Sequence, residues 1–132
     1  MLTRISSTLP DDVEAVATEV IGAAIEAHRA LGPGFLERIY LEALCLELSA
    51  RRIAFERERP IAVTYRGVDI AGQRLDLLVE GVLIIELKAV ARPDPIHESK
   101  VISYLRATGL RLGLLINFNE KLLKAGVRRI VV

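Results

Sequence analysis

The chain has 132 residues, a length that suits one domain built around a single hydrophobic core. Hydrophobic residues make up 52% of it and the mean hydropathy is +0.35, which predicts strands covered on both faces and leaves room for a homodimer contact. The formal net charge of +1 excludes a protein that coats nucleic acid through global charge, and no stretch reaches the roughly 18 uninterrupted apolar residues of a membrane-spanning helix.

The cysteine content and the first residues bear on cellular location. A single cysteine, Cys45, excludes an internal disulfide and a cysteine-based zinc site, which fits a reducing compartment. Residues 1–10 lack the basic-then-apolar layout of a secretion signal. We therefore expect a cytoplasmic protein with an N-terminal extension over residues 1–10, followed by one domain over residues 11–132.

Two helices are expected at the start of this domain. Apolar residues recur at helical spacing over residues 13–31. Gly32 is a suitable C-terminal cap for this helix, and Pro33 prevents its continuation. A second helix with a Leu-rich stripe is then expected over residues 34–50.

Strands dominate the next part of the chain. They are expected at residues 53–65, 68–70, 74–79 and 82–89. Pro60 places the first of them at a sheet edge or at a bulge. Asp94 and Pro95 then start a third helix, which Gly109 ends. The remaining elements are expected to be a strand over residues 112–118, a short helix over 120–125 and a strand over 128–132.

The order of these elements predicts the fold class. The strand at 82–89, the third helix and the strand at 112–118 form a β-α-β crossover, whose two strands are expected to pair in parallel. The preceding strands are joined by short turns and are expected to pair antiparallel. The sequence therefore predicts a single-domain α/β fold, a mixed β-sheet flanked by helices.

Three charged residues interrupt the apolar hairpin at residues 74–89. Asp76, Glu86 and Lys88 are expected to lie at the end of the hairpin that is far from the Glu80-Gly81 turn. Ionised groups in buried strands are unfavourable unless they are paired or bind a metal. Asp76 and Glu86 share a face only if the hairpin has a three-residue loop or a bulge, so we predict such a loop, with Gly81 as the residue that permits it.

Glu37 is a third acid that can join this group. It lies one turn before Leu41 on the apolar stripe of the second helix, so we expect it to face the core. Glu37, Asp76, Glu86 and Lys88 together carry a charge of −2, which a divalent cation would neutralise. Oxygen ligands favour Mg²⁺ or Mn²⁺, and a hard cation beside a lysine suits hydrolysis of a phosphodiester.

A family resemblance adds to this interpretation. The segment from Gly34 to Tyr40, GFLERIY, resembles the signature of the GxxExxY proteins, which are placed in the PD-(D/E)XK nuclease superfamily. The later blocks resemble the same family in the same order, over about residues 12–132. The resemblance implies a restriction-endonuclease-like fold, with Asp76 and Glu86 as metal ligands, Lys88 as the catalytic lysine and Glu37 as the acid on the helix. It thus implies that Lys88, Glu86 and Asp76 are catalytic.

The third helix departs from the family pattern at one position. Family members resemble His-Glu-Ala-Gln followed by Tyr-Leu, whereas this chain has Lys100 four residues before Tyr104. Residues four apart share a helix face, and His97 is near that face, so Lys100, His97 and Tyr104 are the candidates for substrate binding. A lysine donates hydrogen bonds but cannot accept them as an amide does.

Three functions remain open from the sequence. The first is a Mg²⁺- or Mn²⁺-dependent nuclease acting on DNA or RNA, with DNA favoured. The second is a non-catalytic nucleic-acid-binding module with the same fold, which Lys100 and the near-neutral charge favour. The third is a homo-oligomeric interaction protein in which Lys88 and the acids form only an ion-pair network, which the apolar composition favours.

Overall fold

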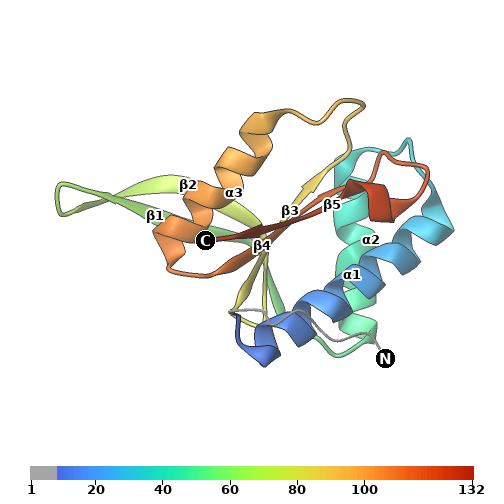
Figure 1. Ribbon diagram of the computed structural model, residues 1–132, viewed down its shortest axis with the longest axis horizontal. Helices are drawn as coiled ribbons and strands as arrows, with labels where there is room; N and C mark the ends of the chain where they lie inside the picture. The colour runs from blue at the N-terminus through green and yellow to red at the C-terminus, as the bar shows by residue number, and fades with distance from the viewer. Residues whose placement is uncertain (1–8) are drawn as a thin grey trace.

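A computed structural model describes residues 9–132, which form a five-stranded sheet with helices on both faces (Figure 1). The strand order is β1-β2-β3-β4-β5, in which β3 and β4 are parallel and the other neighbours are antiparallel. In chain order, the elements are α1 (Asp11–Leu31), α2 (Glu37–Ala50), β1 (Phe55–Tyr65), β2 (Val68–Val79), β3 (Leu83–Lys88), α3 (Pro95–Thr108), β4 (Leu112–Asn117), the 3₁₀ helix η1 (Leu123–Gly126) and β5 (Val127–Val131). The predicted mixed sheet and the parallel crossover are therefore confirmed.

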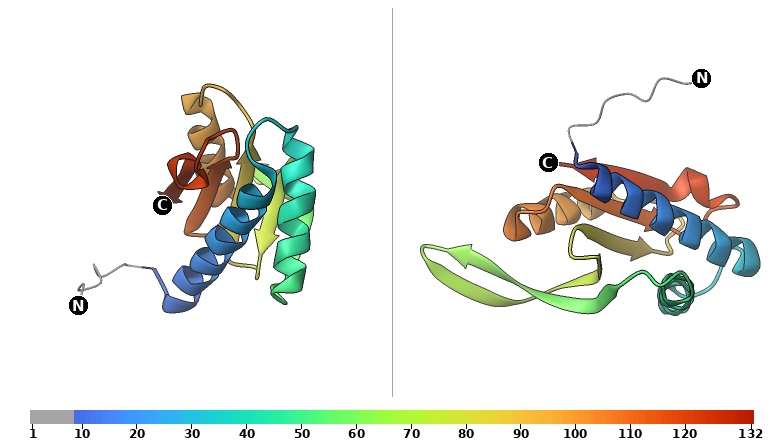
Figure 2. Two further views of the ribbon diagram at one scale, coloured as in Figure 1. Left: turned by 90° about the vertical axis from the view of Figure 1, so that its right-hand side faces the viewer. Right: turned by 90° about the horizontal axis from the view of Figure 1, so that it is seen from below.

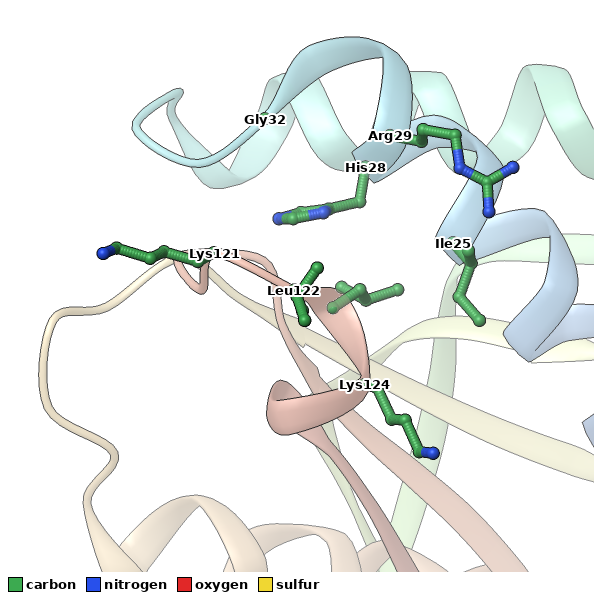
Figure 3. Close-up of a pocket in the computed structure, with 8 residues that line it drawn as sticks. Ile25, His28, Arg29, Gly32, Lys121, Leu122 and Lys124 are labelled. Atoms are coloured by element: carbon green, nitrogen blue, oxygen red, sulfur yellow. The ribbon is translucent and has the colours of Figure 1, made fainter.

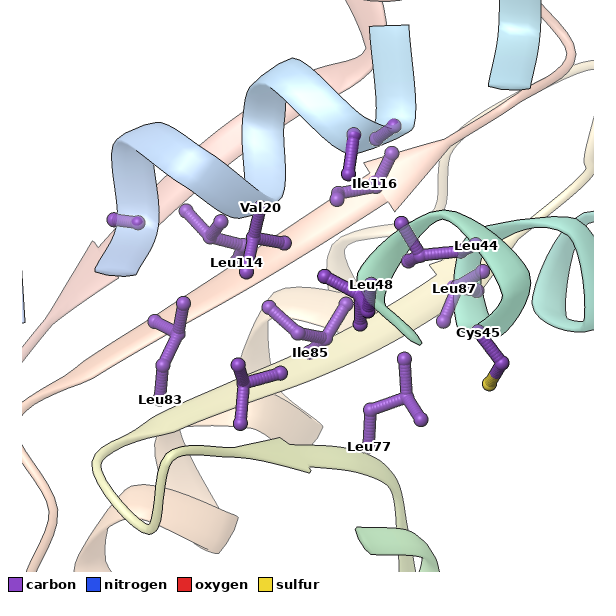
Figure 4. Close-up of a cluster of buried hydrophobic side chains, with 14 of the residues drawn as sticks. Val20, Leu44, Cys45, Leu48, Leu77, Leu83, Ile85, Leu87, Leu114 and Ile116 are labelled. Atoms are coloured by element: carbon purple, nitrogen blue, oxygen red, sulfur yellow. The ribbon is translucent and has the colours of Figure 1, made fainter. Parts of the chain in front are cut away.

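The two faces of the sheet are covered by different helices (Figures 1 and 2). Helices α1 and α2 pack on one face, where Val20 and Leu48 meet Ile85 and Leu114 in the larger core cluster (Figure 4). Helix α3 packs on the other face in a smaller cluster. β3 and β4 are covered on both sides and are buried except for Lys88, which is why they consist almost entirely of apolar residues.

The helix ends follow from the residues that the sequence places there. Gly32 follows α1 with a φ of 70°, and Gly109 follows α3 in the left-handed conformation, which glycine adopts without a steric penalty. The Asp94 side chain accepts a hydrogen bond from the Ile96 backbone N–H, so it is the expected N-terminal cap of α3.

The largest difference from the prediction is in β2. Two short strands were expected at residues 68–70 and 74–79, but the chain is one strand from Val68 to Val79. Gly72 has a φ of 122° and no cross-strand partner, because the β1–β2 register shifts at this point, between Ile61 and Val63. A glycine inside a strand is compatible with such a bulge, so it does not end the strand here. The expected helix at residues 120–125 is likewise only the single 3₁₀ turn η1.

The hairpin register agrees with the prediction. Val79 pairs with Leu83, so residues 80–82 form a three-residue loop. Gly81 has a φ of 68°, as expected of the permissive residue, and Glu80 also has a positive φ of 52°. Continued along the strands, this register places Asp76 opposite Glu86.

The expected N-terminal extension, residues 1–10, falls almost wholly outside the described residues, and its boundary with the domain stays a prediction. Helix α1 begins at Asp11. No helix among residues 9–132 combines the length and the apolar character that are needed to cross a bilayer.

Candidate active site

The acidic pair lies where β2 separates from β3. The ladder between these strands includes only residues 77–79 and 83–85. Beyond it, the Asp76 side chain substitutes for a backbone acceptor, because its Oδ2 atom accepts a 2.8 Å hydrogen bond from the Leu87 N–H. The local separation of two strands thus leaves the Asp76 carboxylate beside the C-terminal half of β3.

Glu86 is the most strongly perturbed acid in this region. Its side chain is on β3 and the residue is only 3% exposed. Burial and the neighbouring charge of Asp76 raise the pKa of Glu86 to about 8, and a hydrogen bond to Asp76 adds to the effect, whereas Lys88 and Lys100 oppose it. At neutral pH and without a cation, this raised pKa favours the protonated form of Glu86.

Lys88 ends β3 and is half-buried. Among residues 9–132, no carboxylate oxygen lies within 4.0 Å of its ammonium group. Together with His97 and Asn117 it lines a small cavity of about 100 Å³. The ion-pair network that the third hypothesis requires is therefore not formed by Lys88 within this part of the chain, and its charge is available to a ligand.

Glu37 does not face the core as expected. It is the first residue of α2 and is exposed, while the buried residues of that helix begin at Tyr40. The apolar stripe continues past the edge of the sheet, so its first residue has no core to contact. Glu37 is nevertheless near the acidic pair: partial desolvation raises its pKa, Lys88 lowers it and Asp76 raises it.

The three candidates on α3 have different environments. His97 has its Nδ1 atom buried, with no hydrogen-bond partner among the described residues, and its pKa is lowered by desolvation and by Lys88, which favours the neutral imidazole. Lys100 is half-buried and lowers the pKa values of Glu37 and Glu86. Tyr104 is buried, and its hydroxyl group accepts a hydrogen bond from a β2 side chain.

The structure brings the predicted acids near one another without forming a complete metal site. Among residues 9–132, no three carboxylate, histidine or cysteine side chains are arranged so that they could hold an ion. Asp76 and Glu86 are paired, whereas Glu37 is linked to this pair only by the charge of Asp76, which raises the Glu37 pKa. The donor set fits Mg²⁺ or Mn²⁺, because it consists of carboxylate oxygens and because a divalent cation would relieve the repulsion that raises the Glu86 pKa.

Tyr40 has the structural role that its place on the α2 stripe suggests. Its hydroxyl group donates to the Gly32 carbonyl oxygen over 2.6 Å and accepts from the Phe35 N–H over 3.1 Å. Its ring stacks on Phe118 at a centroid distance of 4.7 Å. These contacts hold the loop that leads to Glu37, so Tyr40 acts through the position of that loop.

A hollow of about 420 Å³ lies on the α1 side of this loop (Figure 3). Figure 3 shows the His28 ring facing the Leu122 segment, with Lys121 and Lys124 pointing away from one another. His28 is buried, and its Nε2 atom is 2.7 Å from the Glu120 carbonyl oxygen. The lining includes no acid, so this hollow lacks the groups that a hydrolytic site of the kind predicted requires.

Sequence reasoning missed Gln73 and did not assign a role to Asn117. The Gln73 Nε2 atom donates a 2.8 Å hydrogen bond to the Tyr104 hydroxyl group and so joins β2 to α3. Asn117 is buried, and its side chain bonds to both backbone groups of Val90, which holds the segment after β3 against β4. A polar residue at the end of the all-apolar strand β4 was a signal for Asn117, whereas Gln73 carries no local signal.

The comparisons with known proteins agree with this arrangement. The sequence profile of the PD-(D/E)XK nuclease superfamily matches residues 14–130. No curated protein and no solved structure matches the chain. The match extends over nearly all of the sheet and the three helices, including Asp76, Glu86 and Lys88. Common ancestry explains why this chain has a mixed sheet with helices on both faces, and an acidic pair beside a lysine at the end of a central strand. The chain belongs to the PD-(D/E)XK nuclease superfamily.

Proposed function

We propose that this protein is a Mg²⁺- or Mn²⁺-dependent nuclease that hydrolyses phosphodiester bonds of nucleic acid, with Asp76, Glu86 and Lys88 as its catalytic residues. The observation that carries the proposal is the Asp76–Glu86 pair beside Lys88, which has no ion pair within residues 9–132, because Glu86 has the perturbed pKa expected of a functional carboxyl group. Membership of the nuclease superfamily supports the reaction class.

Each residue has a role that follows from its surroundings. Asp76 and Glu86 would hold the cation, and Glu37 would join them from the first turn of α2. The Leu87 N–H orients the Asp76 carboxylate toward β3. Lys88 would place its ammonium group against the phosphate and stabilise the negative charge that develops there. The cation, when bound, supplies Lewis acidity and lowers the pKa of the attacking water.

Substrate binding is proposed for the exposed side of α3. Lys100 would contact a phosphate as a point charge, since it has three donors and no acceptor. The lowered pKa of His97 favours its neutral form, and it lines the same small cavity as Lys88, so it would contribute a hydrogen bond. Tyr104 would act through Gln73, because its hydroxyl group is already engaged with that amide.

DNA stays the favoured substrate, and the cytoplasm is the proposed location because Cys45 is buried and unpaired.

The test is a cleavage assay in which Mn²⁺ is titrated with single- and double-stranded DNA and RNA. Asp76→Asn and Lys88→Ala are expected to lower the rate by at least about 100-fold. Asp12→Asn and Lys124→Ala make the same charge changes at exposed positions of α1 and η1, so they should leave the rate unchanged. Cleavage that persists in Asp76→Asn and Lys88→Ala would show that it does not come from this site.

A non-catalytic nucleic-acid-binding module is the second candidate. Lys100 favours it, because a cation that already lowers the pKa of Glu86 and Glu37 partly replaces the charge of a metal ion. Binding of nucleic acid without cleavage at any Mn²⁺ concentration would support this alternative. A homodimer is a separate prediction, and light scattering would test it.

A further inference from the structure

The β1–β2 hairpin extends beyond the body of the molecule as a two-stranded arm (Figures 1 and 2). Four apolar side chains of the arm lie on the same face, since Val63 is the cross-strand partner of Ile70 and Tyr65 that of Val68. These residues are 45%, 52%, 66% and 62% exposed, respectively. We call this set the apolar arm face. An apolar patch that is exposed and contiguous in this way usually marks a binding surface.

The other face of the arm is polar. Thr64 and Asp69 are cross-strand partners there, and the Thr64 hydroxyl group donates a 2.6 Å hydrogen bond to the Asp69 carboxylate. The arm is therefore amphipathic, although nothing in residues 9–132 covers its apolar side. A random distribution of exposed residues would not place all the large apolar side chains on one side of the ribbon.

The apolar arm face leads into a groove beside α3. The groove has a volume of about 380 Å³, with Ile61 and Val63 of β1 on one side and Ser99, Lys100 and Ser103 of α3 on the other. Ile61 also packs against the core cluster beneath α3. The hydrogen bond between Gln73 and Tyr104 joins the two sides. The groove thus combines an apolar wall with a wall of hydroxyl groups and one cation.

This groove reaches the acidic pair. Lys100 lines the groove from α3, and His97, one turn earlier on the same helix, lines the small cavity that Lys88 also lines. Gln73, on the β2 side, precedes Asp76 by three residues in the same strand. A ligand that occupied the groove would therefore end beside the proposed catalytic residues.

We propose that the groove and the apolar arm face bind an unpaired strand of nucleic acid, so that the proposed nuclease acts on single-stranded substrate. The bases would pack against Val63 and Tyr65, and the phosphates would follow Lys100 and the serine hydroxyl groups of α3. Proteins that bind single strands combine aromatic contacts with a cationic track in this way. The inference rests on the proposed function for the reaction, but the binding surface is a separate set of residues.

A duplex fits these features less well. Its base faces are covered by stacking, so they cannot reach an apolar wall. Binding a duplex also depends on many cations that contact phosphates. Arg59 and Arg74, which flank the arm on β1 and β2, are paired with Glu56 and Glu58, so among the described residues Arg66 in the turn is the one cation of the arm without an ion pair.

A second copy of the chain also fits the apolar arm face less well. Its four side chains expose roughly 400 Å² together, whereas a stable interface buries about 800 Å² on each partner. The strand edge of β1 closer to the body carries Pro60 and charged residues at positions 56–59, which discourage pairing of strands between copies.

The test measures binding by fluorescence anisotropy in EDTA, where metal-dependent cleavage cannot occur. The probes are labelled 20-nucleotide single strands of DNA and RNA and the matching DNA duplex. We expect the wild-type protein to bind a single strand at least about tenfold more tightly than the duplex. Tyr65→Ala is expected to weaken single-strand binding by about fivefold or more, which is the effect of losing one stacked base.

Control variants distinguish an effect on the apolar arm face from an effect on folding. Thr64→Ala changes the polar face of the same arm and should leave single-strand binding unchanged, and Lys100→Gln should weaken binding and reduce its salt dependence. Tyr65 is exposed, so circular dichroism of Tyr65→Ala should match that of the wild type. The proposal is overturned if the duplex binds as tightly as the single strand, or if Tyr65→Ala binds like Thr64→Ala.

Three outcomes distinguish this proposal from the alternatives. Single-strand binding that depends on Tyr65, without cleavage in Mn²⁺, would overturn the proposed nuclease function alone. Cleavage that depends on Asp76 but not on Tyr65 would overturn the proposed groove alone. A wild-type dimer in light scattering that Tyr65→Ala converts to monomers would show that a second copy covers the face, and this too would overturn the proposal.

Discussion

Replacing Glu86 with glutamine is expected to stabilise the metal-free protein at alkaline pH. The folded protein raises the pKa of Glu86 from 4.5 to about 8. Between these values the folded state holds a proton that the unfolded state has released, so stability falls as the pH rises. The loss is absent below pH 4.5 and complete above pH 8. Glutamine does not titrate, and its amide can still donate a hydrogen bond to Asp76, so Glu86→Gln avoids the loss.

The size of the effect follows from the pKa shift. Each pKa unit corresponds to 1.36 kcal/mol, so the raised pKa of Glu86 sets an upper limit of roughly 5 kcal/mol. Because Glu86 interacts strongly with a neighbouring carboxyl group, we expect a measured advantage of about 2 kcal/mol or more for Glu86→Gln at pH 8.5. At pH 4.5 the two proteins should have nearly equal free energies of unfolding.

The measurement is urea unfolding in EDTA at several pH values between 4.5 and 8.5. Glu26→Gln removes an exposed carboxylate from α1, so it serves as the control and should follow the pH dependence of the wild type. Mn²⁺ should then raise the stability of the wild type at pH 8.5 and that of Glu86→Gln much less. If the stabilities of Glu86→Gln and the wild type change in parallel with pH, the account of a buried Glu86 with a raised pKa is wrong.

Three further predictions concern the backbone and the loop before α2, and urea unfolding checks each of them. Gly126→Ala should destabilise by more than about 3 kcal/mol, because its Cβ would overlap the Asn117 carbonyl group. Gly22→Ala, inside α1, should stabilise the protein by about 0.5–1 kcal/mol, because only a flexible arginine side chain is near its Cβ position. Similar changes in the free energy of unfolding for Gly126→Ala and Gly22→Ala would contradict this reasoning. Tyr40→Phe should destabilise by about 1–2 kcal/mol through loss of its bond to Gly32, and an unchanged stability would show that this bond is unimportant.

Features that depend on local patterns were predictable from the sequence. The helix caps at Gly32, Asp94 and Gly109 follow from the conformational preferences of single residues. The parallel pairing of β3 and β4 follows from the helix between them. The three-residue loop was predictable because strand side chains alternate between the two faces of the sheet. Asp76 and Glu86 can share a face only if the loop between the strands has an odd number of residues.

Burial at the ends of elements was not predictable in the same way. The stripe on α2 places Glu37 in line with Tyr40, but only the edge of the sheet decides where the core stops covering that stripe. Strand alternation would place Leu75 and Leu77 on one face, yet Leu75 packs in the α3 cluster and Leu77 in the larger cluster; the β2–β3 ladder ends between them. The periodicity of apolar residues describes a single helix or strand, whereas the burial of its side chains depends on the neighbouring elements.

The sequence alone therefore determined the order of the elements, the type of sheet and the identity of the charged residues in its hairpin. Only the tertiary structure decided that Glu86 retains a proton, that Gln73 reaches Tyr104 and that one face of the arm is left uncovered. The physical reason is separation along the chain. Propensity and periodicity act over a few residues, whereas the pKa of a buried carboxyl group and the exposure of a strand depend on segments that are brought together only by folding.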